Sequence, residues 1–487
     1  MLPSLPTETF REIFKYLDIF SLNNCALVNK LWCINSVGLI WQDPFEFLSE
    51  EREMISRGPK LINTYISCLS PTSLKNLNII PSPFKPFNKA FFDYASFLRN
   101  LDYLILVSSV KQWLKISLKN YKNLNRKEIE KIEVKVIIEL CTSFFQHCRL
   151  RKLGFLPHGL TYIFADNYLR DTPFIQLCDL PNANICLSHL EELRCFGLTP
   201  NEILCRIAEI SNKLKVLDIR DGFERNEGLK KLFEAQNNLQ EFTITTTESL
   251  SLISKSLHKK VQNLRTIHIY CHDHIPLSTF EGVTNIQELT LCDDLRFGPV
   301  MEVDPITTKQ FSSSFTRLKI LDLTLKDRNL LQISSVIRKT NGNLQQISLH
   351  FGIPIDPHNF ITLINTIAET CPNLKQLILR IPNDAINRIP FLLASCSTLK
   401  CVTFVGETEE ISKILVEIGK NIPKDLKRLC LNNEKWTYSE NSLRKFLDNC
   451  EKRLKSKPLI FVRGRNMGKS EVLDSYITKG IVRVVSM

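Results

Sequence analysis

The chain has 487 residues, whereas a single hydrophobic core stops growing at roughly 250–300 residues, so several domains or a repeat array are expected. Hydrophobic residues make up 44% and charged residues 23%, as in folded soluble proteins, and no run approaches the roughly 18 apolar residues of a membrane span. The formal net charge is +12, but Lys and Arg alternate with Asp and Glu almost throughout. Because a nucleic-acid face needs clustered Lys and Arg, we expect neither a nucleic-acid nor a membrane partner.

Cysteine usage indicates a reducing compartment. There are 16 cysteines, no Cys-x-x-Cys pair, and most stand in apolar segments such as Leu193-Arg194-Cys195. We therefore expect buried free thiols and a cytoplasmic or nuclear protein. The run Cys271-His272-Asp273-His274 lacks the loop-length separations of a zinc site, so we expect a loop there and no metal or other cofactor.

Residues 4–45 predict three short helices. Ser4 is expected to cap the first and Ser21 the second. Apolar residues recur at helical spacing through all three segments. A unit of about 40 residues this apolar cannot bury all its stripes alone, so we expect a patch that another polypeptide covers.

The same segment resembles an F-box, the helical module by which a subunit docks onto the Skp adaptor of a ubiquitin ligase. The resemblance rests on Leu5-Pro6-Thr7-Glu8, Leu17, Val28, Leu31-Trp32 and Trp41. Asn29-Lys30 departs from the Cys-Lys or Cys-Arg of many members. The resemblance implies eight adaptor-binding residues: Leu5, Pro6, Ile13, Phe14, Leu17, Leu22, Val28 and Trp32.

Behind this module an apolar repeat of the form Leu-x-x-Leu-x-Leu returns. It begins at Leu150, Leu190, Leu214, Leu239, Leu264, Ile286, Leu318, Leu344, Leu374, Leu399 and Leu426. Most intervals lie near the 20–29 residues of leucine-rich repeats, and the first is long enough to hold an insertion. An earlier match at Leu74-x-x-Leu77-x-Ile79 predicts that the array starts near residue 70.

Between the repeats, segments such as 359–370 have the apolar spacing of short amphipathic helices. Each repeat is thus predicted to be a strand followed by a helix. The predicted fold class is α/β: a three-helix F-box, then a curved solenoid with parallel strands inside and helices outside. We expect residues 1–45 to form the F-box, 46–149 a linker with degenerate repeats, 150–465 the solenoid, and 466–487 a C-terminal cap or tail.

Residues that alternate with the core positions of each strand should face the concave surface. Aromatic, Arg and other polar residues on that surface are the predicted target-binding set, because such residues anchor protein interfaces. The set is Arg194, Phe196, Asp218, Arg220, Glu241, His268, Tyr270, Glu288, Asp322, His350, Arg380 and Arg428.

Gly464-Arg465-Asn466-Met467-Gly468-Lys469-Ser470 resembles a phosphate-binding P-loop, but has three residues between its glycines where that loop has four. No catalytic signature stands out elsewhere, so we expect no enzyme. The resemblance implies a substrate-recognition subunit of a Skp–cullin–F-box ubiquitin ligase, with a Skp-type adaptor, a cullin and an unidentified target as partners. Two alternatives stay open: a non-degradative leucine-rich scaffold with a helical cap, and an NTPase that uses residues 464–470.

Overall fold

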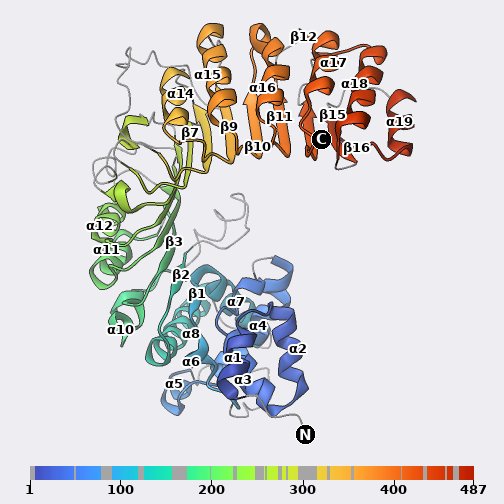
Figure 1. The fold of residues 1–487 in the computed structure, drawn as a ribbon. Helices are drawn as coiled ribbons and strands as arrows, with labels where there is room; N and C mark the ends of the chain where they lie inside the picture. Colours follow the sequence, from blue (N-terminus) through green and yellow to red (C-terminus); the bar gives the residue numbers. More distant parts are fainter. Residues whose placement is uncertain are drawn as a thin grey trace. The chain divides into compact units, whose positions relative to one another are not determined.

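The computed structural model of the chain forms two compact units, Met1–Leu239 and Gln240–Met487 (Figure 1). The residues that it describes are 6–48, 51–77, 90–118, 125–155, 173–197, 199–222, 227–246, 257, 260–271, 277–280, 283–293, 315–325, 330–351, 356–406, 409–431, 436–455, 458–463 and 471–486.

The first unit begins with helices and adds strands later. Its helices are α1 (Thr7–Phe14), α2 (Ile19–Val28), α3 (Lys30–Ile40), α4 (Glu51–Ile66), α5 (Pro71–Asn76), α6 (Tyr94–Phe97), α7 (Tyr103–Ser117), α8 (Arg126–His147), α10 (Ala183–Leu187), α11 (Asn201–Ile210) and α12 (Glu227–Ala235). Its strands are β1 (Asn100–Asp102), β2 (Lys152–Gly154), β3 (Glu192–Phe196) and β4 (Val216–Gly222). They pair in parallel in chain order.

The array does not start near residue 70, and that prediction was wrong. Residues 71–76 form helix α5, whose first residue is Pro71 and whose cap is Ser70; the Ser70 hydroxyl accepts a hydrogen bond from the Ser73 N–H at 3.1 Å. A capped segment with proline in its first turn favours a helix over a strand. The first strand among the described residues, β1, begins only at Asn100, and most of residues 46–149 is helical.

The second unit alternates strands and helices. Its strands are β5 (Glu241–Thr246), β6 (Thr266–Cys271), β7 (Glu288–Asp293), β8 (Ile320–Leu325), β9 (Gln346–Phe351), β10 (Gln376–Arg380), β11 (Cys401–Val405), β12 (Glu409–Glu410), β13 (Arg428–Leu431), β14 (Trp436–Thr437), β15 (Leu459–Arg463) and β16 (Val482–Ser486). Its helices are α14 (Leu330–Arg338), α15 (Pro357–Thr370), α16 (Ile389–Ser395), α17 (Ser412–Asn421), α18 (Glu440–Arg453) and α19 (Glu471–Thr478). Strands β12 and β14 pair in parallel with each other in a separate small sheet, and the other strands of this unit pair in parallel in chain order.

The repeat motif explains this architecture. Each of the eleven motif starts is followed by one of these strands, and the apolar positions of the motif enter the core. In the repeat that begins at Leu374, the side chains of Leu374, Leu377 and Leu379 are all 0% exposed. Helices α14 to α18 stand side by side along one face of the sheet (Figure 1). The predicted fold class, a helical module followed by an α/β leucine-rich solenoid, is confirmed.

The C-terminal region continues the array. Residues 466–487 were expected to be a cap or tail, whereas α19 and β16 form a further helix and strand, and β16 pairs in parallel with β15. Gly464–Ser470 and His272–His274 lie outside the described residues.

The structure also bears on the cysteines, on metal binding and on membrane spans. All sixteen cysteines are free thiols; eleven are buried, as the prediction had it, and five are only partly buried. Among the described residues, no group of His, Cys, Asp and Glu is arranged to hold a metal ion. None of the described helices combines the length and apolar character needed to cross a membrane.

Candidate functional site: the N-terminal helical module

Side-chain caps define where α2 and α3 begin. The Asp18 carboxylate accepts a hydrogen bond from the Ser21 N–H at 2.9 Å, and the Asn29 side chain accepts one from the Trp32 N–H at 2.9 Å. Asp18, and not Ser21 as predicted, is therefore the cap of α2. The hydrogen bonds from the Ser21 N–H and hydroxyl hold the pKa of the exposed Asp18 carboxyl below its usual value. Asn29, the residue that departs from the usual F-box pattern, has a structural role as the cap of α3.

The three helices enclose a small core of their own. Phe14, Leu22 and Cys25 are its buried residues. The Phe14 and Trp32 rings meet edge to face with centroids 5.3 Å apart. The Arg11 Nε donates a hydrogen bond of 3.0 Å to Asn35 Oδ1, which ties α1 to α3. The module thus has a fixed internal arrangement before any partner arrives.

Outside this core, the module leaves large apolar side chains in solvent. They range from Tyr16, 88% exposed, and Leu27, 85% exposed, down to 42% exposed, and we call them the docking surface: Ile13, Tyr16, Phe20, Leu27, Val28, Leu31 and Ile34. Phe20 and Leu27 are seven residues apart on α2, so they share one face of that helix. Exposed apolar groups gathered in so short a segment mark a site that another molecule covers.

The predicted adaptor-binding residues divide between the surface and the core. Ile13 and Val28 are exposed and belong to the docking surface, and Pro6 is exposed at the start of α1. Leu5 lies outside the described residues. The others pack inside the module, two of them buried and two partly buried: Phe14, Leu22, Leu17 and Trp32.

Sequence reasoning missed five members of the docking surface: Tyr16, Phe20, Leu27, Leu31 and Ile34. The helical spacing of apolar residues was visible, but it does not say which stripe faces inward. The seven-residue interval between Phe20 and Leu27, on the side of α2 away from Leu22 and Cys25, was the available signal.

The opposite side of the module is sealed by later helices of the same unit. The Trp41 ring lies 4.1 Å from the Tyr94 ring and 5.6 Å from the Tyr65 ring, measured between centroids. Phe45 is 0% exposed and stacks on Tyr65 at 6.4 Å. Trp41, a residue of the F-box resemblance, therefore attaches the module to α4 and α6 and is not part of the docking surface.

The predicted target-binding residues lie on strands of both units. Those in the first unit are on β3 and β4, and those in the second are on β5 to β10 and on β13. Eleven of the twelve are partly or fully exposed, as the strand alternation predicts. Phe196 is the exception: it is only 3% exposed, so its ring cannot serve as an open anchor.

Several of these side chains are already engaged with one another. Arg220 Nε lies 2.7 Å from Asp218 Oδ1, and His268 Nε2 lies 3.1 Å from Glu288 Oε1. Burial lowers the pKa of His350 below its ordinary value; neighbouring Asp322 opposes that shift. The strand face is polar and of mixed charge.

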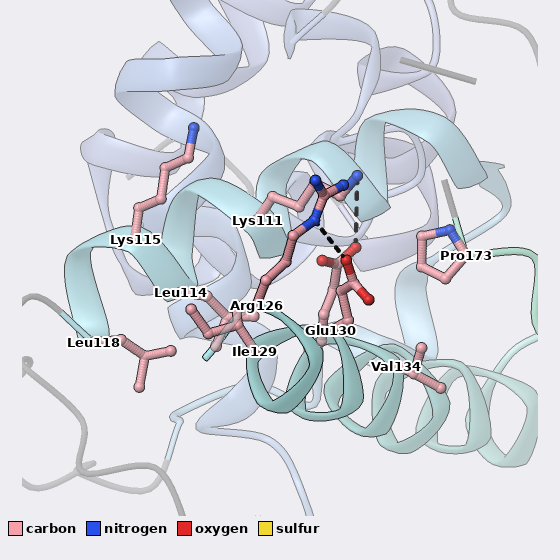
Figure 2. Close-up of a pocket in the computed structure, with 10 residues that line it drawn as sticks. Lys111, Leu114, Lys115, Leu118, Arg126, Ile129, Glu130, Val134 and Pro173 are labelled. Atoms are coloured by element: carbon pink, nitrogen blue, oxygen red, sulfur yellow. Dashed lines mark hydrogen bonds and ion pairs between the residues drawn. The ribbon is translucent and has the colours of Figure 1, made fainter. Parts of the chain in front are cut away.

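A hollow of about 740 Å³ lies between α7 and α8 of the first unit. Its apolar lining includes Leu114 and Ile129. Figure 2 shows the Arg126 guanidinium turned toward Glu130, with Nε 2.9 Å from Oε1. Lys111 similarly lies 3.8 Å from Glu133. Two of the three described cations that line the hollow therefore face carboxylates, and its lining points to no particular class of ligand.

Comparisons with known proteins agree with the module. Residues 2–46 match the model of the F-box-like family. No curated protein matches the chain. Among solved structures, the mouse RP105/MD-1 complex aligns with 66% of this chain and 62% of its own, under two thirds of that chain, at 14% identity and a TM-score of 0.34. The N-terminal segment of this chain, residues 2–46, is thus an F-box-like domain.

Proposed function

We propose that this chain is the substrate-recognition subunit of a Skp–cullin–F-box ubiquitin ligase, in the cytoplasm or nucleus. The observation that carries the proposal is the docking surface on an F-box-like domain that already has its own core. F-box domains generally bind Skp-type adaptors, and the exposed Tyr16, Phe20 and Leu27 side chains are the apolar anchors such an interface needs.

The repeats would hold the target. A strand face of mixed charge, with Tyr270 and Arg380 partly exposed, suits a protein surface more than a phosphate backbone. The adaptor would connect the chain to a cullin that carries the ubiquitin-conjugating machinery. Holding the target there raises the effective concentration of its lysines, so no group of this chain needs to take part in bond making.

Charge substitutions on the docking surface test the adaptor role. Phe20→Asp and Leu27→Asp each place a carboxylate where an apolar contact is proposed, and we expect either to abolish co-purification with a Skp-type adaptor. Leu331→Asp is the matched control, because Leu331 is an equally apolar, 45% exposed residue on α14 of the second unit. Point variants are preferable to removal of residues 1–45, since that removal would uncover the Tyr65 and Tyr94 rings that Trp41 contacts.

The two readings of the N-terminal module predict different results. A subunit of a ubiquitin ligase binds the adaptor as intact chain and as Leu331→Asp, and loses it in the two docking-surface variants. A non-degradative scaffold shows no adaptor binding in any of them, and that result would refute the proposal. Target capture by the intact chain under proteasome inhibition would then identify what the repeats hold.

A further inference from the structure

The second unit carries a row of basic residues that the proposed function does not use. The row consists of the residues at the second position of each repeat motif, directly before each strand of the main sheet from β5 to β13. From Arg265 onward, each backbone N–H donates to the carbonyl of the preceding member at 2.7–2.8 Å, so neighbouring members stand at the starts of adjacent strands. We call it the basic row: Gln240, Arg265, Gln287, Lys319, Gln345, Lys375, Lys400 and Lys427.

No member of the basic row is acidic, and five of the eight carry a positive charge. Arg265, Lys319, Lys375, Lys400 and Lys427 are all exposed. Within the described residues, no ion pair involves any of the four lysines; Lys375 Nζ instead donates to the neutral Gln345 Oε1 at 2.9 Å. Like charges on adjacent strands repel one another, so an anion placed along the row would be favoured.

The densest part of the row borders a hollow of about 470 Å³. Lys375, Lys400 and Lys427 directly precede three strands that pair in succession, β10, β11 and β13, and they line the hollow together. The described lining residues include one carboxylate, the exposed Asp425, and no aromatic ring. Single-stranded nucleic acid is bound largely by stacking its bases on aromatic side chains, so this lining suits an acidic polypeptide better.

We propose that the basic row binds an acidic polypeptide segment, laid across the strand starts from β8 to β13. Strands lie about 4.8 Å apart, so the four intervals from Lys319 to Lys427 span about 19 Å. An extended peptide rises about 3.3 Å per residue and covers this distance in about six residues. The segment therefore carries several Asp, Glu or phosphorylated side chains within about six residues. The row lies outside both the docking surface and the predicted strand-face set.

Peptide binding to the intact chain, without adaptor, tests this proposal. The probe is a fluorescent eight-residue peptide with four Glu, beside the same peptide with four Gln and an RNA of eight nucleotides. The row variant is Lys375→Gln/Lys400→Gln/Lys427→Gln. The control Lys413→Gln/Lys445→Gln/Lys452→Gln removes the same charge from exposed positions on α17 and α18.

We expect the Glu peptide to bind saturably, the row variant to bind it at least tenfold more weakly, and the control variant to change by less than twofold. Affinity should fall as salt rises, because exposed charges are screened. Four results would overturn the proposal: no saturable binding, equal binding of the Gln peptide, equal losses in both variants, or tighter binding of the RNA to the row. Since the adaptor is absent, none of them bears on the docking surface.

Discussion

The N-terminal module and the second unit differ in what they do with apolar side chains. Among the described residues, seven large apolar side chains are exposed between Ile13 and Ile34, and only four in the whole second unit. Repeats cover one another, since each strand and helix has a neighbour that completes its burial. The short three-helix module is covered by later helices only where Trp41 packs on Tyr65 and Tyr94, and its own core holds three buried residues.

The two regions therefore differ in how much of their apolar surface is buried by folding alone. In the second unit, folding alone buries the apolar surface, and Leu374, Leu377 and Leu379 are closed off at 0% exposure. In the module, folding fixes the arrangement of α1 to α3 but leaves the docking surface exposed to solvent, where a binding partner would cover it. Substitutions in the two regions should therefore separate stability from binding.

The largest expected effect is a cavity in the second unit. Phe404 on β11 is 0% exposed, and Phe404→Ala should destabilise that unit by about 3–5 kcal/mol. The neighbouring Thr403→Ala should cost much less, because Thr403 is only partly buried. Chemical denaturation of the intact chain measures both. An equal effect of the two variants would contradict the burial pattern of this strand.

The next largest effect is a loss of adaptor affinity with no loss of folding stability. Phe20→Ala removes an exposed ring, so we expect the thermal transition to stay unchanged while adaptor affinity falls by about 2 kcal/mol, roughly 30-fold. Leu22→Ala, two residues away in the core, should lower the stability of the module instead. Calorimetry of adaptor binding and circular dichroism distinguish the two. A Phe20→Ala variant that melts early would mean that the ring supports the fold.

Much of the repeat array could be predicted from the sequence. Its motif sets a period near 25 residues and places leucines where each strand needs them, so all eleven starts precede strands. Prediction failed at Leu74, where an apolar triplet fits the motif but Ser70 and Pro71 begin a helix. A single six-residue motif is weaker evidence for a strand than a helix cap followed by proline is for a helix, unless the motif recurs at the repeat period on both sides.

The candidate site was harder to predict because periodicity identifies an apolar face without saying what covers it. Phe14 and Phe20 look alike in the sequence, yet Phe14 is 2% exposed and Phe20 is 78% exposed. Their difference depends on how α1, α2 and α3 cross, which only the three-dimensional arrangement shows. The prediction for Phe196 was wrong for a related reason: strand alternation places its side chain away from the core, yet this last residue of β3 is only 3% exposed.

A half-buried carboxylate tests the region where the first unit changes from helices to strands. The Asp102 side chain caps α7 by accepting from the Ile105 N–H at 3.0 Å. Burial raises its pKa from the usual 3.8 to about 7; nearby Asp43 adds to the shift and Arg194 opposes it.

Because this pKa is higher in the folded chain than in the unfolded one, the Asp102 contribution is most favourable at low pH and declines as pH rises from about 4 to about 7. Asp102→Asn retains a capping oxygen without the charge, so it should match the natural chain at pH 4 and be more stable at pH 8. Urea titrations at the two pH values measure this. Equal stabilities at pH 8 would show that the Asp102 carboxylate is adequately solvated.

The smallest effect expected is that of a single cap in the module. Asn29→Ala removes the side chain that accepts from the Trp32 N–H, at a cost of about 1 kcal/mol in the stability of α3. Because Leu31 and Ile34 of the docking surface stand on this helix, adaptor affinity should fall with it, whereas Asn29→Asp should preserve both. Hydrogen exchange of the α3 amides and adaptor titration follow the two quantities. If Asn29→Ala frays α3 and leaves adaptor affinity unchanged, then Leu31 and Ile34 do not contact the adaptor, and the docking surface is limited to the residues that precede α3.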